Sequence, residues 1–296
     1  MMTDSGEHRP LRDAATVILT RDGAQGLEVF LMRRHREQAF MGGAFVFPGG
    51  ALDPGDGDPD LLPWIDGVSA DEAVRSLQEP ELPPSRALGL YMAAIRETFE
   101  EAGVLLARDG RGRPPTCPDG ETEARFTATR KALHDGQTTL RDLATREHLR
   151  FALDLMVPYA HWITPFVEKK RFDTRFFLAR VPDGQVPLHD AVEMTESLWI
   201  PPDRALDAYR LREIRLMPPT LKTLTELCRF GDTTALFQVA RGRRIVPILP
   251  QACSLDGMAT VLLPHDPAYG IDGYRQPPRP DEPSRIVFRD KLWQLI

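Results

Sequence analysis

The sequence predicts a mixed α/β (α+β) fold, in which a mixed β-sheet is sandwiched between helices and carries a helical insertion and a C-terminal β-rich annex. Three observations predict it: short β-branched or apolar runs recur along the chain, apolar residues at three- and four-residue spacing mark helices between them, and segments rich in Pro and Gly separate the two. With 296 residues and 42% hydrophobic composition, the chain can bury a substantial core.

The first two strands are expected at residues 14–20 and 27–34. Both runs are apolar or β-branched. Asp22, Gly23 and Gly26 lie between them, and this combination is a hairpin signal. We therefore expect the chain to begin with two paired strands.

A surface insertion is expected next, at about residues 57–90. The segment from 53 to 90 is dense in Pro, Gly and Asp. Ser69 and Glu72 have the spacing of a capping box, in which each residue satisfies a backbone N–H of the other. One short helix is therefore predicted over residues 70–78.

A longer amphipathic helix is predicted from Ser85 to Gly103. Apolar residues recur every three or four positions along it: Leu88, Met92, Ile95, Phe99 and Ala102. Gly103 is the residue type that most readily adopts the left-handed conformation at a helix end. One face of this helix is expected to pack on the core.

The rest of the chain is divided into helical and strand-like segments. Helices are expected at 121–156 and at 218–231, where Gly231 closes the second, and strands at 159–165, 174–180 and 197–200. Four short strand-like runs follow, at 235–240, 243–250, 258–264 and 285–288. This pattern predicts one domain over residues 10–231 and a C-terminal extension over residues 232–296.

Composition and charge argue against several classes of protein. No apolar run approaches the roughly 18 residues that a membrane-spanning helix needs, so no membrane association is expected. The net charge of -6 argues against nucleic acid as a partner, because phosphate backbones favour a surplus of Lys and Arg. Cys117, Cys228 and Cys253 are few and far apart, which fits neither a disulfide framework nor a zinc site. We expect a cytoplasmic protein, with a homodimer as a candidate assembly.

Three glutamates of the longer helix suggest a metal site. Glu97, Glu100 and Glu101 occupy positions i, i+3 and i+4, so their carboxylates project from one face. Because like charges repel, a hard divalent cation that takes oxygen ligands would stabilise the arrangement. Arg96 lies four positions before Glu100 and can pair with it. The alternative is an ordinary solvated helix face.

These glutamates combine with two glycines into a known pattern. Gly49 and Gly50 follow a strand-like run and allow the backbone to approach a charged ligand. Gly50 is followed after five residues by Asp56, and residues 96–104 read RETFEEAGV. Together they resemble the Nudix box, G-x5-E-x7-R-E-U-x-E-E-x-G-U, in which U is aliphatic. The resemblance implies a Nudix hydrolase and the Nudix fold.

The chain departs from this pattern in three ways. Asp56 stands in place of Glu, Thr98 stands in place of an aliphatic residue, and 39 residues separate Asp56 from Arg96 where the pattern has seven. An insertion at this place, with AFMGGAFVFPGG before it and RFDTRFFLA after it, resembles the acyl-coenzyme A diphosphatase branch of the family.

The resemblance also implies the residues of the site. Glu97, Glu100 and Glu101 would bind Mg²⁺ or Mn²⁺, together with the carbonyl of Gly49, and Arg96 would hold the glutamates in place. We expect all four charged residues to be catalytic residues.

A further carboxylate is implied from a loop before a late Trp-bearing strand. Glu193, six residues before Trp199, is the candidate for this catalytic role, and Glu196 is its rival. Glu100 and Glu193 are both open as the general base that takes the proton of the attacking water.

The implied substrate is a small-molecule nucleoside diphosphate derivative. The branch implies hydrolysis of coenzyme A or acyl-coenzyme A to 3′,5′-ADP and (acyl-)phosphopantetheine. The alternatives are another derivative, such as ADP-ribose or a dinucleotide, and a non-catalytic nucleotide-binding module. Arg33, Arg34 and Arg171 are candidates for contacting the substrate phosphates, with solvated surface as the other interpretation.

The insertion carries an apolar patch made of Leu61, Leu62, Trp64, Ile65 and Val68. Two interpretations are open. The patch could cover the substrate and hold its acyl arm, or it could pack the insertion onto the domain.

Overall fold

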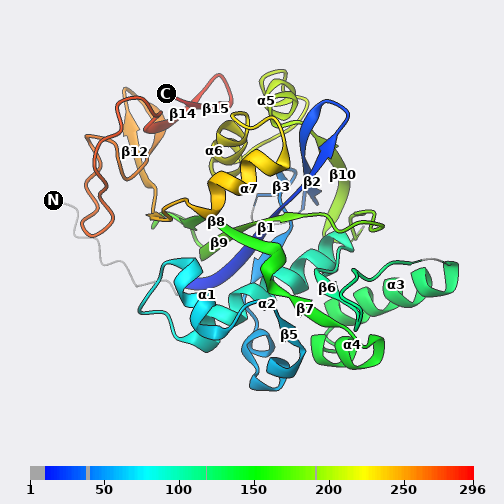
Figure 1. Ribbon diagram of the computed structural model, residues 1–296. Coiled ribbons are helices and arrows are strands. Elements are labelled where there is room, and N and C mark those ends of the chain that lie inside the picture. The colour runs from blue at the N-terminus through cyan, green and yellow to red at the C-terminus, as the bar shows by residue number, and fades with distance from the viewer. Residues whose placement is uncertain (1–10, 38–40, 118, 191) are drawn as a thin grey trace.

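The computed structural model describes residues 11–37, 41–117, 119–190 and 192–296. Its centre is an eight-stranded sheet in the order β10-β2-β1-β9-β8-β11, in which β3 also pairs with β2 and β4 with β1 (Figure 1). These strands are β1 (Leu11–Gly23), β2 (Gly26–Arg34), β3 (Phe45–Val46), β4 (Gly49–Ala51), β8 (Met156–Ile163), β9 (Arg171–Arg180), β10 (Met194–Ile200) and β11 (Pro247–Ile248). β1 is parallel to β9 and β11 to β8, whereas the other pairs are antiparallel. The predicted mixed sheet is confirmed.

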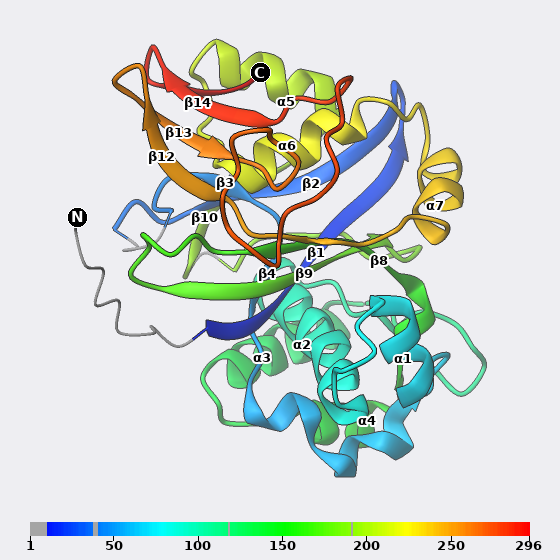
Figure 2. The same cartoon turned by 90° about the vertical axis from the view of Figure 1, so that its left-hand side faces the viewer.

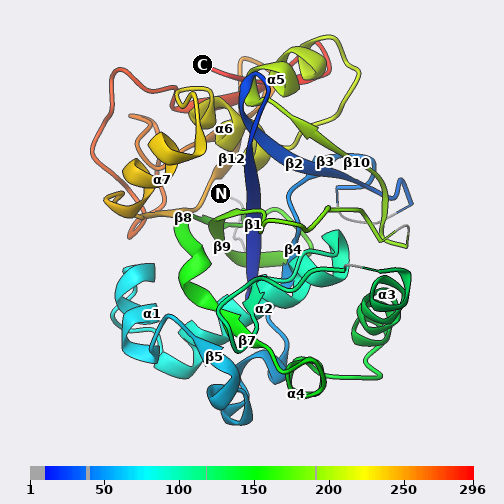
Figure 3. The same ribbon diagram turned by 45° about the vertical axis from the view of Figure 1, so that its right-hand side comes forward.

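Helices cover both faces of this sheet. Figures 2 and 3 show one group on one side, with α1 (Ala70–Leu77), α2 (Pro84–Ala102), α3 (Gly120–His134) and α4 (Leu140–Glu147), and a second group on the other, with α5 (Pro202–Arg210), α6 (Pro218–Leu227) and α7 (Thr233–Arg241). Each group has its own hydrophobic core against the sheet. The predicted arrangement of a sheet between helices is therefore confirmed.

Helix α2 follows its sequence pattern closely. It begins at Pro84, a residue suited to the first turn because its missing N–H would have no partner there. Gly103 ends it in the left-handed conformation, with φ +68°. Its apolar residues are buried against β1, so the helix is fixed along the sheet.

The insertion is a compact lobe packed onto this helix. The 3₁₀ helix η1 (Pro54–Gly57) leads into it. The insertion itself contains the 3₁₀ helix η2 (Pro59–Trp64), the short strand β5 (Ile65–Asp66) and α1, whose capping box of Ser69 and Glu72 is formed as predicted. Of the apolar patch, Leu61 is buried in the core, and Trp64, Ile65 and Val68 pack against it. Leu62 alone is exposed, at 54%. The patch therefore serves to pack the insertion onto the domain.

The prediction of a helix over 121–156 was wrong in its last part. After α4 the chain forms β7 (Arg150–Ala152), the short 3₁₀ helix η3 (Leu153–Leu155) and then β8. β7 pairs with β5 and with β6 (Ala107–Arg108) in a three-stranded sheet. His148 ends α4 in the left-handed conformation, a role that sequence patterns usually assign to Gly or Asn.

The prediction of a strand at 235–240 was also wrong, because this segment belongs to α7. Asp232 caps the helix by accepting a hydrogen bond from the N–H of Ala235, at 2.7 Å. Leu236, Phe237 and Ala240 are buried at helical spacing. Gly231 does not close the preceding helix, which ends at Leu227 with Cys228 at its C-cap.

The C-terminal β-rich annex is confirmed as a four-stranded antiparallel sheet. Its strands are β12 (Gln251–Leu255), β13 (Met258–Leu262), β14 (Arg285–Arg289) and β15 (Leu292–Leu295), in that order. α7 and β11, which precede it, belong to the central layers. The division at 231/232 remains a prediction, and residue 10 lies outside the described residues. No helix in the described ranges is long and apolar enough to cross a membrane.

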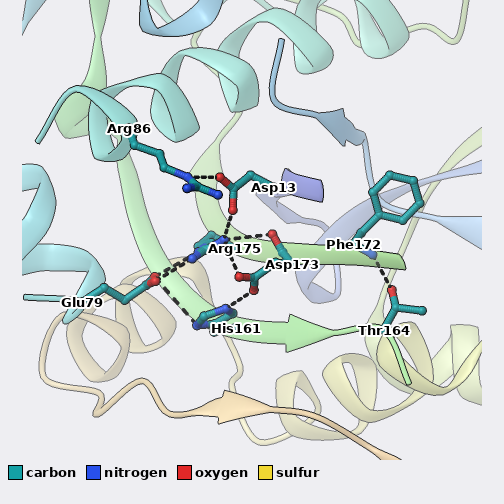
Figure 4. Close-up of polar contacts among 8 residues, drawn as sticks. All are labelled: Asp13, Glu79, Arg86, His161, Thr164, Phe172, Asp173 and Arg175. Carbon is teal, nitrogen blue, oxygen red and sulfur yellow. Dashed lines mark hydrogen bonds and ion pairs between the residues drawn. The ribbon is translucent and has the colours of Figure 1, made fainter. Parts of the chain in front are cut away.

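A buried ionic network ties the insertion to the sheet (Figure 4). The guanidinium of Arg175 on β9 donates to Glu79 after α1 at 2.9 Å and to Asp13 on β1 at 2.8 Å, and lies 3.2 Å from Asp173. Arg86 in the first turn of α2 also binds Asp13. His161 on β8 binds Asp173 through Nε2. Arg175 is therefore a shared cation for three carboxylates from three segments.

Replacing Arg175 with Met should destabilise the protein by about 3–5 kcal/mol, the range found when one partner of a buried ion pair is removed. The change leaves the carboxylates of Asp13, Glu79 and Asp173 without their common cation. Urea unfolding of parent and variant measures the loss. The exposed neighbour Arg12 supplies a control, Arg12→Met, which should change stability little. Equal effects of the two substitutions would contradict the assigned role of Arg175.

Candidate active site

The polar side of α2 carries the predicted cluster of charges. Glu100 and Glu101 are 7% and 4% exposed, and Arg96 is 8% exposed. These residues are therefore buried, unlike a solvated helix face. Glu97 lies within electrostatic reach of both Glu100 and Glu101. The three side chains belong to the face of α2 beside residues 49–51, which carry Gly49 and Gly50 and are called the glycine loop below.

Arg96 is the cation at the centre of this cluster. Its guanidinium forms a bidentate pair with Asp56, at 2.8 and 2.9 Å, and donates to Glu97 at 2.9 Å and to Glu100 at 3.3 Å. It also donates to the carbonyl of Ala51, at 2.8 Å. The expected pairing of Arg96 with Glu100 is therefore present. The pairing with Asp56 was not predicted, although the box pattern marked that position.

The glycine loop approaches the glutamates closely. The N–H of Gly49 donates to Glu101 Oε2 at 2.8 Å. A Cβ atom at Gly50 would lie 2.3 Å from Glu97 Oε1, a distance that would displace the carboxylate. Any other residue at position 50 would therefore push Glu97 out of the cluster.

Burial makes ionisation of these glutamates unfavourable. It raises the pKa of Glu97 to about 7 and the pKa of Glu100 to about 7, although Arg96 opposes both shifts. The pKa of Glu101 is also raised well above its ordinary value, first by burial and then by Glu97. One arginine is too little positive charge for this set of carboxylates.

A divalent cation fits the chemistry of this donor set. The buried carboxylates of Glu100 and Glu101 and the half-buried carboxylate of Glu97 offer the oxygen ligands that hard cations prefer. In the described part of the chain no three acidic, His or Cys side chains are already arranged around one point. Arg96 engages Glu97 and Glu100, and the Gly49 N–H engages Glu101, so a metal ion would compete with these partners.

Two further predicted residues lie near Glu101. Arg34 lowers the pKa of Glu101 and Glu193 raises it, which places both charges within electrostatic reach of this carboxylate. The carbonyl of Glu193 accepts a hydrogen bond from the N–H of His35, at 2.8 Å. The Nε atom of Arg34 is buried and has no hydrogen-bond partner among the residues described. Arg34 therefore has an unused donor beside the cluster.

Arg33 on β2 and Glu196 on β10 pair with each other between neighbouring strands. The Nη1 atom of Arg33 lies 3.1 Å from Glu196 Oε2, and both side chains are partly exposed. Glu196, the rival of Glu193, is therefore engaged by a surface arginine on the neighbouring strand. This pairing favours Glu193 as the carboxylate nearer the cluster.

Arg171 lies outside the cluster. It pairs with Leu11 in the ladder between β1 and β9, whereas Gly50 pairs with Ala15 on β1. Four residues of strand correspond to about 13 Å. Arg171 donates to the carbonyl of Thr164 at 3.1 Å and stacks on Phe166. The structure thus does not bring Arg171 to the glutamates.

Comparison with known proteins gives consistent similarities. The family described as NUDT19 Nudix domain matches residues 70–230. The acyl-coenzyme A diphosphatase NUDT19 of Homo sapiens is 30% identical over 83% of this chain and 73% of its own length. The protein of that name from Gallus gallus is 27% identical over 89% and 81%. A crystal structure of a NUDIX hydrolase from Alicyclobacillus acidocaldarius has a TM-score of 0.62 and 27% identity, covering 80% of this chain and 97% of its own.

The raised pKa of Glu100 predicts a pH-dependent stability in metal-free protein. The ordinary value is 4.5 and the folded value is about 7, so the folded state binds this proton more tightly than the unfolded state. The contribution to stability is therefore present below about pH 4.5 and lost as the pH rises through about 7. Glu100→Gln should remove on the order of 3 kcal/mol of this loss.

Denaturant unfolding in EDTA at about pH 5 and about pH 8 measures the effect. Glu123→Gln on the exposed side of α3 is the matched control and should leave the pH dependence unchanged. If Glu100→Gln shows the same fall in stability as the parent, burial of an ionised Glu100 does not limit stability.

Proposed function

The chain belongs to the Nudix hydrolase family, in the branch described by the NUDT19 Nudix domain, and from this premise we propose that it hydrolyses the diphosphate linkage of coenzyme A or acyl-coenzyme A. The products would be 3′,5′-ADP and (acyl-)phosphopantetheine. The relatives named acyl-coenzyme A diphosphatase support this substrate class. The observation that carries the proposal is the cluster of the buried Glu100 and Glu101 and the half-buried Glu97 beside the glycine loop.

Nudix hydrolases use divalent metal ions, and we propose Mg²⁺ or Mn²⁺ here. Glu97, Glu100, Glu101 and the carbonyl of Gly49 would hold the ion. When bound, the ion withdraws charge from the diphosphate oxygens and lowers the pKa of a bound water. The raised pKa values of the glutamates support this assignment, because added positive charge would favour their ionised forms.

The protein's own groups would position the reaction and move the proton. Arg96 would keep Glu97 and Glu100 in place through its hydrogen bonds to both. Glu100, which Arg96 holds by a hydrogen bond of 3.3 Å, is the first candidate to take the proton of the attacking water, because a bound cation would keep its carboxylate ionised. Glu193 is the second candidate for this role, since its charge acts on Glu101.

Arg34 and Arg33 would contact the substrate's phosphates. The unused Nε donor of Arg34 lies beside the cluster, and a guanidinium suits phosphate oxygens because it presents several N–H groups in one plane. Arg33 already pairs with Glu196. We therefore assign the main phosphate contact to Arg34 and place Arg171 outside the substrate site.

Glu101→Gln should lower metal affinity and turnover together. The amide keeps the shape of the side chain and removes one ligand charge, and the ion supplies much of the transition-state stabilisation, so kcat should fall by about 10²-fold or more. Calorimetric titration with Mn²⁺ and a steady-state assay measure the two losses. The control Glu123→Gln should change neither. Full turnover in Glu101→Gln would remove this residue from the metal site.

The substrate assignment is tested with coenzyme A, a long-chain acyl-coenzyme A, ADP-ribose and a dinucleotide. Reaction in ¹⁸O-water followed by mass spectrometry would identify the products and the phosphorus atom that receives the oxygen. We expect the coenzyme A compounds to have the highest kcat/KM. Rapid cleavage of ADP-ribose with no reaction of either coenzyme A compound would assign the site to another diphosphate. Binding of nucleotides without any turnover would indicate a non-catalytic module.

Arg34→Gln should raise the KM for coenzyme A more than it lowers kcat, because the change removes a substrate contact and leaves the glutamates intact. Arg171→Gln is the matched control and should leave KM nearly unchanged. Steady-state kinetics of both variants with coenzyme A measures the changes in KM and kcat. A larger effect from Arg171→Gln would reverse the assignment of the two arginines.

A further inference from the structure

A second charged site lies on the opposite side of the central sheet. A partly open cavity of about 40 Å³ lies between α6, the β8/β11 edge and the C-terminal extension. Figure 2 shows the C-terminal strands beside α6, and the two share one hydrophobic cluster. Its titratable lining residues are Tyr159, Lys222, Glu226, Arg243, Arg244, His265 and Arg279.

Positive charge exceeds negative charge in this cavity. Glu226 pairs with Lys222 and, at 2.8 Å, with Arg243, so one carboxylate serves two cations. Although burial opposes ionisation, Lys222 and Arg243 lower the pKa of Glu226 and keep it charged. Arg279 pairs with Glu282 outside the lining, at 3.3 Å. Arg244 makes no ion pair or hydrogen bond with any residue in the described ranges.

His265 is a buried lining residue of this cavity, and its Nε2 atom lies 3.2 Å from the carbonyl oxygen of Pro283. Burial lowers the pKa of His265, and Arg279 and Lys222 lower it further, whereas the hydrogen bond to Pro283 and the charge of Glu282 oppose this shift. His265 therefore adds no negative charge to the lining.

Residues 243–245, which carry Arg243 and Arg244 and form the loop of this cavity, are held in place without a ligand. Gln78, the residue that ends α1, donates to the carbonyl of Arg243 at 2.8 Å and accepts from the N–H of Ile245 at 3.0 Å. The guanidinium of Arg243 also stacks on the ring of Tyr159, 4.4 Å from its centroid. A loop fixed at both sides loses little conformational entropy when it binds a ligand.

We propose that this cavity binds a phosphate group. A space that holds one water needs about 10–15 Å³, so 40 Å³ corresponds to about three waters, which is close to the size of one phosphate. Arginine and lysine are the side chains that bind phosphate oxygens with charge-assisted hydrogen bonds. Arg244 and Arg279 are exposed lining residues. Arg279 is paired with Glu282, so Arg244 supplies the positive charge that no carboxylate neutralises among the described residues.

This site is separate from the metal-binding cluster and does not depend on the proposed function. One row of paired residues crosses the sheet from Gly50 through Ala15, Arg175 and His161 to Pro247. Four strand spacings correspond to about 19 Å. Val246 and Ile248, which flank Pro247, line the cavity, whereas Glu97 lies beside Gly50 at the other end.

The test is calorimetric titration of the full-length protein, with Mg²⁺ present, with inorganic phosphate against chloride of the same ionic strength. Arg244→Gln and Arg279→Gln should each weaken phosphate binding by about tenfold, the effect of losing one charge-assisted hydrogen bond. Arg241→Gln removes the same charge from the exposed end of α7 nearby and should have no effect. Ribose 5-phosphate in place of inorganic phosphate distinguishes the source: tighter binding assigns the site to a phosphomonoester, and weaker binding assigns it to the free ion.

Three results would overturn the proposal. The parent protein would bind no phosphate beyond the chloride control, or Arg241→Gln would weaken binding as much as Arg244→Gln, which would indicate general surface attraction. In the third, Arg34→Gln alone would abolish binding, which would assign the phosphate to the metal-binding cluster. None of these results bears on hydrolysis of the diphosphate, so the two proposals fail independently.

Discussion

The guanidinium of Arg96 is the interaction on which the active-site geometry depends. It is the only cation in direct contact with Glu97 and Glu100 among the described residues, and it holds Asp56 with two further hydrogen bonds. A lysine could not replace it, because one ammonium has no planar fork with which to bind Asp56 and the two glutamates at once. The glycine loop, the insertion and the helix therefore share one anchor, and the position of the glutamates follows from it.

This anchor explains how the chain tolerates 39 residues between Asp56 and Arg96. The entropic cost of closing a loop grows only slowly with its length, so the insertion adds little cost if its two ends are held together. Asp56 is held at the start by Arg96, and Glu79 is held near the end by Arg175. Between them, Leu61 and its apolar neighbours are in the core. The insertion is thus an integrated part of the domain and packs against α2, the helix that carries the glutamates.

Local features could be predicted from the sequence, and contacts between distant segments could not. The capping box of Ser69 and the spacing of the glutamates depend on neighbouring residues, and both are present in the structure. Residues 235–240 were assigned to a strand because they are apolar, although Asp232 is a helix cap that could have been recognised. Arg175 and Asp13 are 162 positions apart, and no sequence pattern marks that pair. The same limitation applies to Arg171, which lies near other basic residues in sequence but away from the glutamates in space.

The register of the central sheet determines how its polar sites are arranged. Gly50, Arg175 and Pro247 belong to one row of paired residues, so the glycine loop, the buried ionic network and the edge of the cationic cavity lie at successive positions across the sheet. A shift of one residue between β1 and β9 would turn Arg175 to the other face and leave Asp13 and Glu79 without their cation. Gln78 and Glu79 are adjacent in the chain, yet the first binds the loop of the cationic cavity and the second binds the ionic network. The end of α1 therefore joins two polar sites that the sheet holds at a fixed distance, and any movement of the insertion must disturb both.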